Sequence, residues 1–274
     1  MQNNKSLMDS FENNRQSWNE LTTLHIDSDF YDVAGFRKGK SSLKHIEIEE
    51  LGEIGGKSLL HLQCHFGLDT LSLARQGAKV VGVDISDTSI QKATELAGEL
   101  KIPAKFIRSN MYDIEQVLND TFDIVYTSYG AINWLNDLDA WAKIINRYLK
   151  PNGIFYMVEF HPFIYTLNQN AEITDSYFKS KPLESAVEHS YTDKSRVSKK
   201  NLKHLEWHHS LSEVVNSLIA NGLTIEFLNE FPYQVYNCFP NLKEVESGKW
   251  VSEKYGDKIP HMFSVKAKKV SCMD

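Results

Sequence analysis

The amino-acid sequence predicts an α/β fold in which helices cover both faces of a mostly parallel sheet. Between Lys57 and Phe160, short apolar segments alternate with segments of helical periodicity. This rhythm is typical of right-handed βαβ units. The apolar segments lack the polar alternation of a half-exposed strand, which indicates strands covered on both sides. The expected strands are Ser58–Leu62, Lys79–Val83, Lys105–Arg108, Phe122–Thr127 and Ile154–Phe160.

Helices are expected between these strands, because start and stop signals flank each helical pattern. The first helix covers Leu68–Gln76 and is followed by a glycine. The second has Ser86 as its N-cap and continues to Leu100. The third covers Asp137–Leu149, where apolar residues recur at the spacing of one helix face.

The regions outside this alternating core are less regular. We expect a loose first dozen residues, then helices at Phe11–Leu24 and Ser41–Leu51 with a loop at Asp27–Lys40 between them. After Phe160 the rhythm stops, and residues 162–209 are polar and aromatic without a clear period. The remaining elements are a helix at Leu211–Ala220 and strands at Leu223–Phe231 and Met262–Lys269.

Composition and charge exclude several classes of protein. The chain has 274 residues, a net charge of −6 and a sequence pI of about 5.9, so it lacks the broad basic surface of a nucleic-acid-binding protein. Cys64, Cys238 and Cys272 are odd in number and widely spaced, which predicts neither a disulfide framework nor a zinc ribbon. The sequence shows no signal peptide and no apolar stretch of the ~18 residues that a membrane span needs. We therefore expect a cytoplasmic protein with no nucleic-acid and no membrane partner.

A candidate binding loop follows the first core strand. The segment from Leu62 to Gly67 joins that strand to the helix beginning at Leu68. Backbone N–H groups and the helix dipole at such a turn favour a negatively charged ligand group. Asp84 ends the next strand, 21 positions after Gln63, close to the spacing between a nucleotide-binding loop and the acid that holds its ribose.

The loop lacks the glycines of a dinucleotide site. A Gly-x-Gly-x-x-Gly fingerprint lets a pyrophosphate lie against the backbone. Here Gln63, His65 and Leu68 stand at the three glycine positions, and their side chains would crowd a pyrophosphate. An NAD(P)-dependent oxidoreductase is therefore the weaker alternative, and a nucleoside ligand that carries an amino-acid carboxylate fits better.

With this loop and acid, the sequence resembles class I S-adenosylmethionine-dependent methyltransferases. The resemblance rests on four segments of the predicted core: Leu59–Ser86, Ser109–Met111, Phe122–Val125 and Leu149–Gly153. A narrower bacterial subgroup is similar in its Leu-Gln-Cys-His-Phe-Gly loop and in further segments along the chain. These are Leu62–Ser72, Asp29–Val33, Glu206–Ser210 and Leu223–Phe227.

The resemblance implies a Rossmann-like, seven-stranded sheet with an antiparallel last strand. It also implies four parts: an N-terminal helical lid (1–56), a cofactor-binding core (57–161), a substrate-cap insertion (162–209) and a C-terminal completion of the core (210–274). The implied cofactor is S-adenosylmethionine, with S-adenosylhomocysteine as product.

Roles for individual residues follow from the same resemblance. The methionine part of the cofactor would lie against the loop, the ribose on Asp84, and the adenine against the residues after it. Tyr129 would lie near the sulfonium. The implied cofactor-binding residues are Leu62, Gln63, Cys64, His65, Gly67, Asp84, Ile85, Asn110, Met111 and Tyr129. The sequence departs from the usual pattern at His61, where an acid is common, and at Gln63 and His65, where glycines are common.

Substrate-pocket and catalytic candidates are drawn from the lid, the insertion and the ends of two strands. The pocket candidates are Tyr31, Trp134, His161 and Trp207. His161 and His208 are the candidates for a general base, should the methyl acceptor need to lose a proton. A structural role is the alternative for each of these histidines. His204, His208, His209 and Glu206 do not have the spacing of a zinc-binding helix, so no metal is expected.

We therefore expect a methyltransferase that acts on a small molecule by in-line transfer. The alternative from another class is a non-catalytic S-adenosylmethionine-binding sensor or partner protein, because no obligatory catalytic residue marks this chemistry in a sequence. A nucleic-acid methyltransferase is disfavoured by the net charge of −6. As a partner we expect a small-molecule methyl acceptor, and the chain itself to be a monomer or homodimer.

Overall fold

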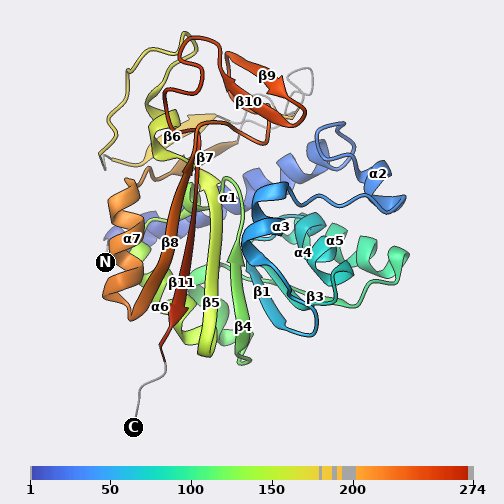
Figure 1. Cartoon of the computed structure of the whole chain (residues 1–274). Helices are drawn as coiled ribbons and strands as arrows, with labels where there is room; N and C mark the ends of the chain where they lie inside the picture. The colour runs from blue at the N-terminus through green and yellow to red at the C-terminus, as the bar shows by residue number, and fades with distance from the viewer. Residues whose placement is uncertain (1, 179–180, 187–189, 193–201, 271–274) are drawn as a thin grey trace. The chain divides into compact units, whose positions relative to one another are not determined.

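A computed structural model describes residues 2–178, 181–186, 190–192 and 202–270, and the side chains from residue 8 onward (Figure 1). Among the described residues, no helix combines the length and the apolar character that crossing a bilayer would need. The helices are α1 (Gln2–His25), α2 (Val33–Arg37), α3 (His45–Leu51), α4 (Leu68–Arg75), α5 (Asp87–Leu100), α6 (Leu138–Tyr148) and α7 (Leu211–Ala220), with 3-10 helices η1 (Met111–Gln116), η2 (Ile132–Trp134) and η3 (Pro162–Thr166).

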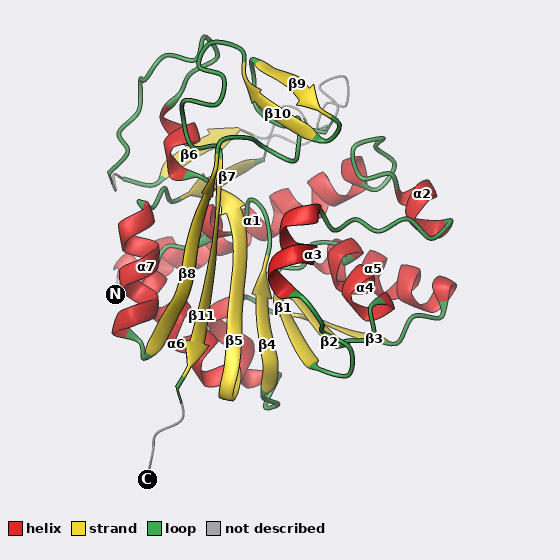
Figure 2. Cartoon of the chain, in the orientation of Figure 1, coloured by secondary structure: helices red, strands yellow, loops and turns green. Residues whose placement is uncertain are grey.

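The strands confirm the predicted fold class (Figure 2). They are β1 (Ser58–Leu62), β2 (Lys79–Asp84), β3 (Ala104–Arg108), β4 (Phe122–Thr127), β5 (Leu149–Phe160), β6 (Leu183–Ala186), β7 (Lys203–Glu206), β8 (Leu223–Phe231), β9 (Leu242–Glu246), β10 (Lys249–Ser252) and β11 (Met262–Lys269). Seven of them form one sheet in the order β3-β2-β1-β4-β5-β11-β8. β1 runs parallel to β2 and β4, whereas β11 is antiparallel to both β5 and β8. The last strand of the sequence therefore lies inside the sheet, between two neighbours.

Two expectations for the N-terminal part were wrong. The first dozen residues are not loose, because α1 begins at Gln2, and the sequence has no glycine or proline there to stop a helix. The expected loop at Asp27–Lys40 contains α2, whose N-cap is Asp32; its carboxylate accepts a hydrogen bond from the Gly35 N–H at 2.9 Å. A helix of five residues is too short to show a period in the sequence.

Further elements were missed in the later part. The turn expected near Pro151 lies within β5, where Asn152 keeps a positive φ of 63°. The insertion holds β6 and β7, an antiparallel pair, and the tail holds the antiparallel pair β9 and β10. Residues 179–180, 187–189 and 193–201 of the insertion lie outside the described residues, as does Cys272.

The described chain divides into two compact units. Unit 1 consists of residues 1–126 and 183–206, and unit 2 consists of residues 127–182 and 207–274. Residues 162–209 are divided between the two units, and their role as a substrate cap stays a prediction.

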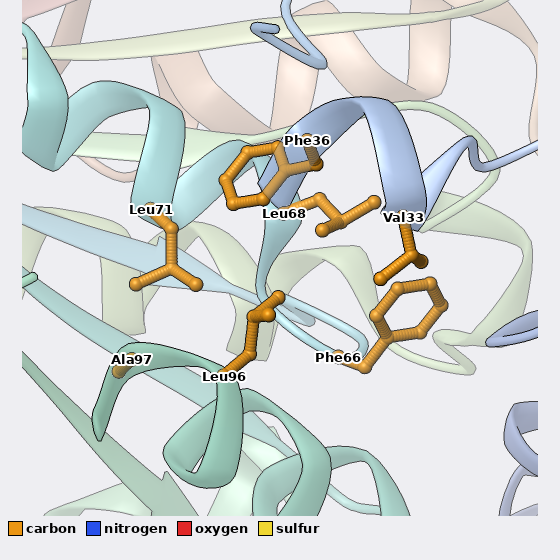
Figure 3. Close-up of a cluster of buried hydrophobic side chains, with 7 residues drawn as sticks. All are labelled: Val33, Phe36, Phe66, Leu68, Leu71, Leu96 and Ala97. Carbon is orange, nitrogen blue, oxygen red and sulfur yellow. The ribbon is translucent and has the colours of Figure 1, made fainter. Parts of the chain in front are cut away.

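In unit 1 the N-terminal region packs directly on the first two core helices. Helix α2 contributes two apolar side chains, and the loop after β1 contributes a phenylalanine (Figure 3). They meet apolar side chains of α4 and α5 in one buried cluster. The members of this cluster are Val33, Phe36, Phe66, Leu68, Leu71, Leu96 and Ala97. Burial of these side chains fixes the N-terminal region beside the loop at Leu62–Gly67.

Polar contacts join helix α1 to the start of α5. The Asn19 side-chain oxygen accepts hydrogen bonds from the Ser86 hydroxyl at 2.7 Å and from the Thr88 N–H at 3.1 Å. The Thr22 and Ser89 hydroxyls lie 2.7 Å apart and are both buried. Ser86 thus caps α5, as its position in the sequence predicted, and also contacts α1.

Unit 2 is built on β5, β8 and β11 with helices α6 and α7. Helix α6 buries Trp141, Ile145 and Tyr148 completely or nearly so. The Asn146 amide donates to the Asn221 carbonyl at 2.7 Å, which links α6 to the end of α7. Lys269 closes the last strand by donating to the Leu149 carbonyl at 2.9 Å and to the Asn146 carbonyl at 2.6 Å.

We expect Ser86→Ala to lower the free energy of unfolding by about 1–2 kcal/mol, because it removes both the cap of α5 and the hydrogen bond to Asn19. Urea denaturation of the full chain measures this change. Ser247→Ala, at an exposed turn, serves as the control and should change it by less than about 0.5 kcal/mol. Equal effects of the two substitutions would contradict the role given to Ser86.

Candidate functional site

The loop after β1 adopts a backbone that glycine would normally occupy. Gln63, His65 and Gly67 have φ values of 56°, 50° and 81°, so every second residue lies in the left-handed region. This region costs a residue with a side chain of the order of 1 kcal/mol. The loop therefore keeps a glycine-type conformation although Gln63 and His65 stand where glycines are common, and it does so against local strain.

Gly67 and Gly82 are needed for close packing behind this loop. A Cβ at Gly67 would lie 2.8 Å from the Phe106 ring and 2.9 Å from the Ala93 Cβ. A Cβ at Gly82 would lie 2.7 Å from Phe106 and 2.8 Å from the Cys64 Sγ. The two glycines thus allow α4, α5, β2 and β3 to approach one another beneath the loop.

Asp84 joins the loop to the end of β2. One carboxylate oxygen accepts from the His65 N–H at 2.8 Å, and the other accepts from the Ser86 N–H at 2.8 Å. Burial raises the Asp84 pKa to about 6, although these backbone donors oppose the rise. The Ile85 N–H is a third backbone donor to the same carboxylate.

The end of β3 is fixed beside Asp84. The Ser109 N–H donates to the Asp84 carbonyl at 2.9 Å. Asn110 caps η1 by accepting from the Tyr112 N–H at 3.1 Å, and Met111 is buried. Ile85 is partly buried directly after Asp84. The structure thus places three of the predicted adenine-side residues around the ends of β2 and β3.

His61 replaces the acid that is common at the end of the first strand. Its ring is buried, and Nδ1 lies 2.8 Å from the Thr70 hydroxyl in α4. Burial lowers the His61 pKa to about 3, so the ring is neutral at pH 7. This position therefore carries no negative charge in this chain.

Aromatic side chains from the N-terminal region surround His65. The rings of Trp18, His25 and Tyr31 lie 5.2, 5.2 and 5.4 Å from the His65 ring. Burial lowers the pKa values of His25, to about 3, and of His65, so both rings are neutral. Tyr31 also meets Tyr191 of the insertion through their hydroxyls. Tyr31 thus lies beside the loop, and its role in a substrate pocket stays a prediction.

In unit 2 a buried acid that sequence reasoning missed organises the segment after β4. Glu159 is 1% exposed, and its carboxylate accepts from the N–H groups of Gly130 at 2.5 Å, Ala131 at 2.8 Å, Ile132 at 3.2 Å and Phe160 at 2.7 Å. Burial raises the Glu159 pKa to about 7, against the effect of these donors. In the sequence, the signal for this role was a single glutamate near the end of an otherwise apolar strand.

The segment held by Glu159 carries two predicted site residues. Tyr129 directly precedes Gly130, and the Trp134 indole N–H donates to the Gly130 carbonyl at 2.7 Å. The Trp207 N–H donates to the Asn133 carbonyl at 2.7 Å, and its side chain is 8% exposed. Tyr129, Trp134 and Trp207 therefore belong to one region of unit 2.

The two candidate bases differ in their surroundings. His161 is 4% exposed; its Nδ1 accepts from the Phe163 N–H at 3.1 Å, and its Nε2 lies 2.9 Å from a Glu230 carboxylate oxygen. Burial lowers the His161 pKa, while the nearby Glu230 charge opposes the decrease. Nδ1 is engaged in a hydrogen bond and Nε2 lies beside the Glu230 carboxylate, which favours the structural role. His208 is partly exposed, and its ring lies 5.1 Å from that of Tyr165.

The predicted residues fall into two groups, one in each unit. Unit 1 brings together the loop residues, the residues that follow β2 and β3, and Tyr31. Unit 2 brings together the residues around the Glu159 carboxylate and the two histidines. Among the described residues, no group of histidine, cysteine, aspartate and glutamate side chains has a metal-binding arrangement.

We expect Glu159→Gln to lower the free energy of unfolding by about 3 kcal/mol at pH 5, because in either orientation the amide nitrogen would face two buried N–H donors and leave them unpaired. Thermal and urea denaturation measure this loss. Glu253→Gln, at an exposed position of the same unit, is the control and should have little effect.

The difference between wild type and Glu159→Gln should narrow as the pH rises from about 4.5 to about 7. The pKa of Glu159 in the folded chain is about 7, above the ordinary value of 4.5. The unfolded chain therefore loses this proton first, and the wild type loses stability over that interval while the glutamine variant does not. A difference that widens over the same interval would contradict the raised pKa.

Comparison with known proteins gives a family match for the central part of the chain. Residues 60–157 match the model of a family described as a methyltransferase domain. This segment begins in β1, includes the loop and Asp84, and ends within β5. It therefore contains the residues predicted to hold the cofactor.

Curated relatives agree with this match. An uncharacterized methyltransferase of Synechocystis sp. is 30% identical over 126 residues, which cover 45% of this chain and 56% of that protein. A ubiquinone biosynthesis O-methyltransferase of Photorhabdus laumondii is 28% identical, with coverage of 45% and 48%. The chain spans about half the length of these two relatives.

Solved structures share the fold. An S-adenosylmethionine-dependent methyltransferase from Mesorhizobium loti has a TM-score of 0.54 and 20% identity, and the similarity covers 85% of this chain and 99% of that one. A geranyl diphosphate C-methyltransferase from Streptomyces coelicolor, solved with S-adenosyl-L-homocysteine, has a TM-score of 0.52 and 15% identity, with coverage of 86% and 76%. At these identities the likeness extends to the fold alone.

Proposed function

We propose that this chain, whose residues 60–157 match a methyltransferase domain family, is an S-adenosylmethionine-dependent methyltransferase that acts on a small molecule. The observation that carries the proposal is the contact between the loop after β1 and Asp84. A loop with alternating left-handed residues is tied to the carboxylate at the end of the next strand. This arrangement suits a nucleoside that bears an amino-acid chain.

The residues of unit 1 fit this cofactor. The Asp84 carboxylate, at the end of β2 beside the loop, would accept hydrogen bonds from the ribose hydroxyls. Ile85, Asn110 and Met111 would contact the adenine. The segment Leu62–Gly67 would hold the methionine part, where Gln63 and His65 leave less room than glycines would for a pyrophosphate. The dinucleotide alternative is disfavoured for the same reason.

We also propose that the chain belongs with the bacterial subgroup whose loop reads Leu-Gln-Cys-His-Phe-Gly, here Leu62–Gly67. The strain at Gln63 and His65 supports this proposal, because a left-handed residue with a side chain persists only where its surroundings fix it. The aromatic rings packed on His65 supply such surroundings.

When bound, the cofactor supplies an electrophilic methyl group on a sulfonium centre. The work of the protein is then to orient the acceptor in line with that group and to exclude water. Tyr129 and Trp134 in unit 2 are held by the Glu159 arrangement and would contact the acceptor. No protein nucleophile is required if the acceptor atom is itself nucleophilic.

The acceptor is proposed only as a small molecule. The named relatives transfer methyl groups to different atoms, since one is an O-methyltransferase and another a C-methyltransferase. A net charge of −6 disfavours a nucleic-acid acceptor. A non-catalytic sensor would bind the cofactor but release no S-adenosylhomocysteine with any acceptor, so turnover separates the two functions. A cytoplasmic monomer or homodimer with no membrane partner remains part of the proposal.

We expect wild-type protein to bind S-adenosylhomocysteine, and Asp84→Ala to weaken binding at least tenfold. The substitution removes the hydrogen bonds from the ribose hydroxyls to the Asp84 carboxylate, and a hydrogen bond to a charged group contributes about 1.5–3 kcal/mol. Isothermal titration calorimetry measures both affinities. Asp120→Ala, at an exposed aspartate of the same unit, is the control. If the wild-type protein does not bind S-adenosylhomocysteine, the proposed function is wrong.

Binding should also depend on pH through Asp84. Its pKa is about 6 in the free protein, and ribose hydroxyls donate better to the ionised form. The affinity for S-adenosylhomocysteine should therefore fall as the pH is lowered through about 6. Asp84→Asn should bind more weakly at pH 8 and show a flatter pH dependence. The same pH dependence in this variant would assign it to another group.

A further inference from the structure

Two histidine side chains from distant parts of unit 1 meet at the loop after β1. His25 is the last residue of α1, and His65 lies in the loop. Nδ1 of His25 lies 3.4 Å from Nε2 of His65, at the long end of the range for a hydrogen bond. Their ring centroids are 5.2 Å apart. The N-terminal region therefore contacts the loop through a polar atom as well as through ring packing.

The end of α1 is fixed on both sides of His25. Thr22 and His25 are three positions apart, so they lie on one face of the helix. The Thr22 hydroxyl lies 2.7 Å from the Ser89 hydroxyl of α5. After the helix, Ser28 donates to the His25 carbonyl from its N–H at 2.9 Å and from its hydroxyl at 2.6 Å. His25 thus approaches the loop from a backbone that is itself held in place.

The proton positions in the contact follow from the second nitrogen of His25. Burial keeps both rings neutral, so each ring has one N–H and one bare nitrogen. Nε2 of His25 is buried and has no hydrogen-bond partner among the described residues. A buried N–H without an acceptor is costly and rare, so the proton of His25 is on Nδ1. His25 therefore donates, and His65 accepts at Nε2 and carries its own proton on Nδ1.

The accepting residue has a backbone that needs outside support. His65 has a φ of 50°, in the left-handed region that a residue with a side chain keeps only where its surroundings fix it. The rings of Trp18 and Tyr31 pack beside its imidazole, at 5.2 and 5.4 Å. Ring packing restrains the position of the imidazole, whereas a hydrogen bond is directional and also restrains its rotation. The contact with His25 is therefore a specific restraint on His65.

The conformation of His65 determines what Asp84 binds. The His65 N–H donates to an Asp84 carboxylate oxygen at 2.8 Å. The φ angle of a residue sets the direction of its N–H relative to its side chain. If the side chain of His65 is held, the left-handed φ fixes the direction of this N–H. Contacts with His25 and Asp84 thus involve the two ends of one strained residue.

We propose that His25 is a positioning residue of the cofactor site: its Nδ1–H donates to Nε2 of His65 and so holds the backbone that directs the His65 N–H to Asp84. This inference rests on the proposed function and adds to that site a residue from α1. His25 acts through His65, and the proposal gives it no contact with the cofactor.

Ring packing alone is the competing role for His25. Its ring also lies 5.4 Å from that of Tyr31 and 4.6 Å from that of Tyr191, and the residue is 0% exposed. A phenylalanine would supply the same kind of packing without the cost of burying two polar nitrogens. A histidine at this buried position is therefore better explained when its Nδ1 has a use, and the contact with His65 supplies one.

The first test is nuclear magnetic resonance of the free wild-type chain near neutral pH, which needs no variant that could fail to fold. Long-range nitrogen-15 correlation spectra distinguish the two neutral tautomers of a histidine, and the spectrum of His65→Gly assigns the signals. We expect the Nδ1–H tautomer to predominate at both His25 and His65. The Nε2–H tautomer at either residue, or equal averaging of the two forms at His65, would overturn the proposal.

Binding of S-adenosylhomocysteine separates the hydrogen bond from ring packing. His25→Phe keeps an aromatic ring but loses Nδ1. His25→Asn loses the ring but keeps an amide that can donate from roughly the position of Nδ1. Calorimetry should show an affinity lowered about fivefold in His25→Phe, as expected for the loss of one neutral hydrogen bond, and within about threefold of wild type in His25→Asn. The reverse order would assign His25 to packing and overturn the proposal.

A double variant tests whether His25 acts through His65. His65→Gly removes the accepting side chain and suits a left-handed backbone, while it keeps the N–H that Asp84 binds. Adding His25→Phe to this variant should lower the affinity by less than about twofold further, because the partner is gone. A further loss of about fivefold would show that His25 acts independently of His65, contrary to the proposal. Thr23→Ala, at an exposed position of α1, is the control and should bind as wild type does.

The outcomes separate this inference from the proposed function. Binding of S-adenosylhomocysteine by wild type with an equal affinity in His25→Phe would reject the role of His25 and leave the methyltransferase assignment intact. Failure of wild type to bind S-adenosylhomocysteine would reject both. A circular dichroism spectrum of each variant checks that it is folded.

Discussion

The candidate cofactor site depends on one interaction, the contact of the partly buried Asp84 carboxylate with two backbone N–H groups. One belongs to His65 in the loop after β1, and the other belongs to Ser86 at the start of α5. Because a buried carboxylate without donors would be costly, this side chain fixes the loop and the helix start together. Helix α1 then contacts the same helix start through Asn19.

Glu159 acts in unit 2 as Asp84 does in unit 1. Each acid is at or near the end of a strand and holds backbone N–H groups of the segments that bear candidate site residues. Burial raises the pKa of both groups, to about 6 and about 7. Each of the two carboxylates is costly to desolvate, and hydrogen bonds from its backbone N–H partners offset that cost. The rigidity that results is what a site for in-line transfer requires.

Several parts of the site could be predicted from the sequence because local chemistry specifies them. Asp84 ends β2 two positions before the N-cap Ser86, and its spacing from Gln63 predicts a ribose-binding acid. Glu159 could not be recognised in the same way. Its partners at residues 130–132 are distant in the chain, and the pattern of an apolar strand does not reveal what one buried glutamate will meet.

The sequence by itself determined the alternation of strands and helices, because apolar periodicity and capping residues act within a few positions of one another. It also determined the loop, Asp84 and the class of fold. The tertiary structure decided what depends on contacts between distant segments: the place of β11 between β5 and β8, the left-handed conformation of Gln63 and His65, and the grouping of aromatic rings around Tyr129. Packing fixes these features, and packing is not encoded in any local pattern.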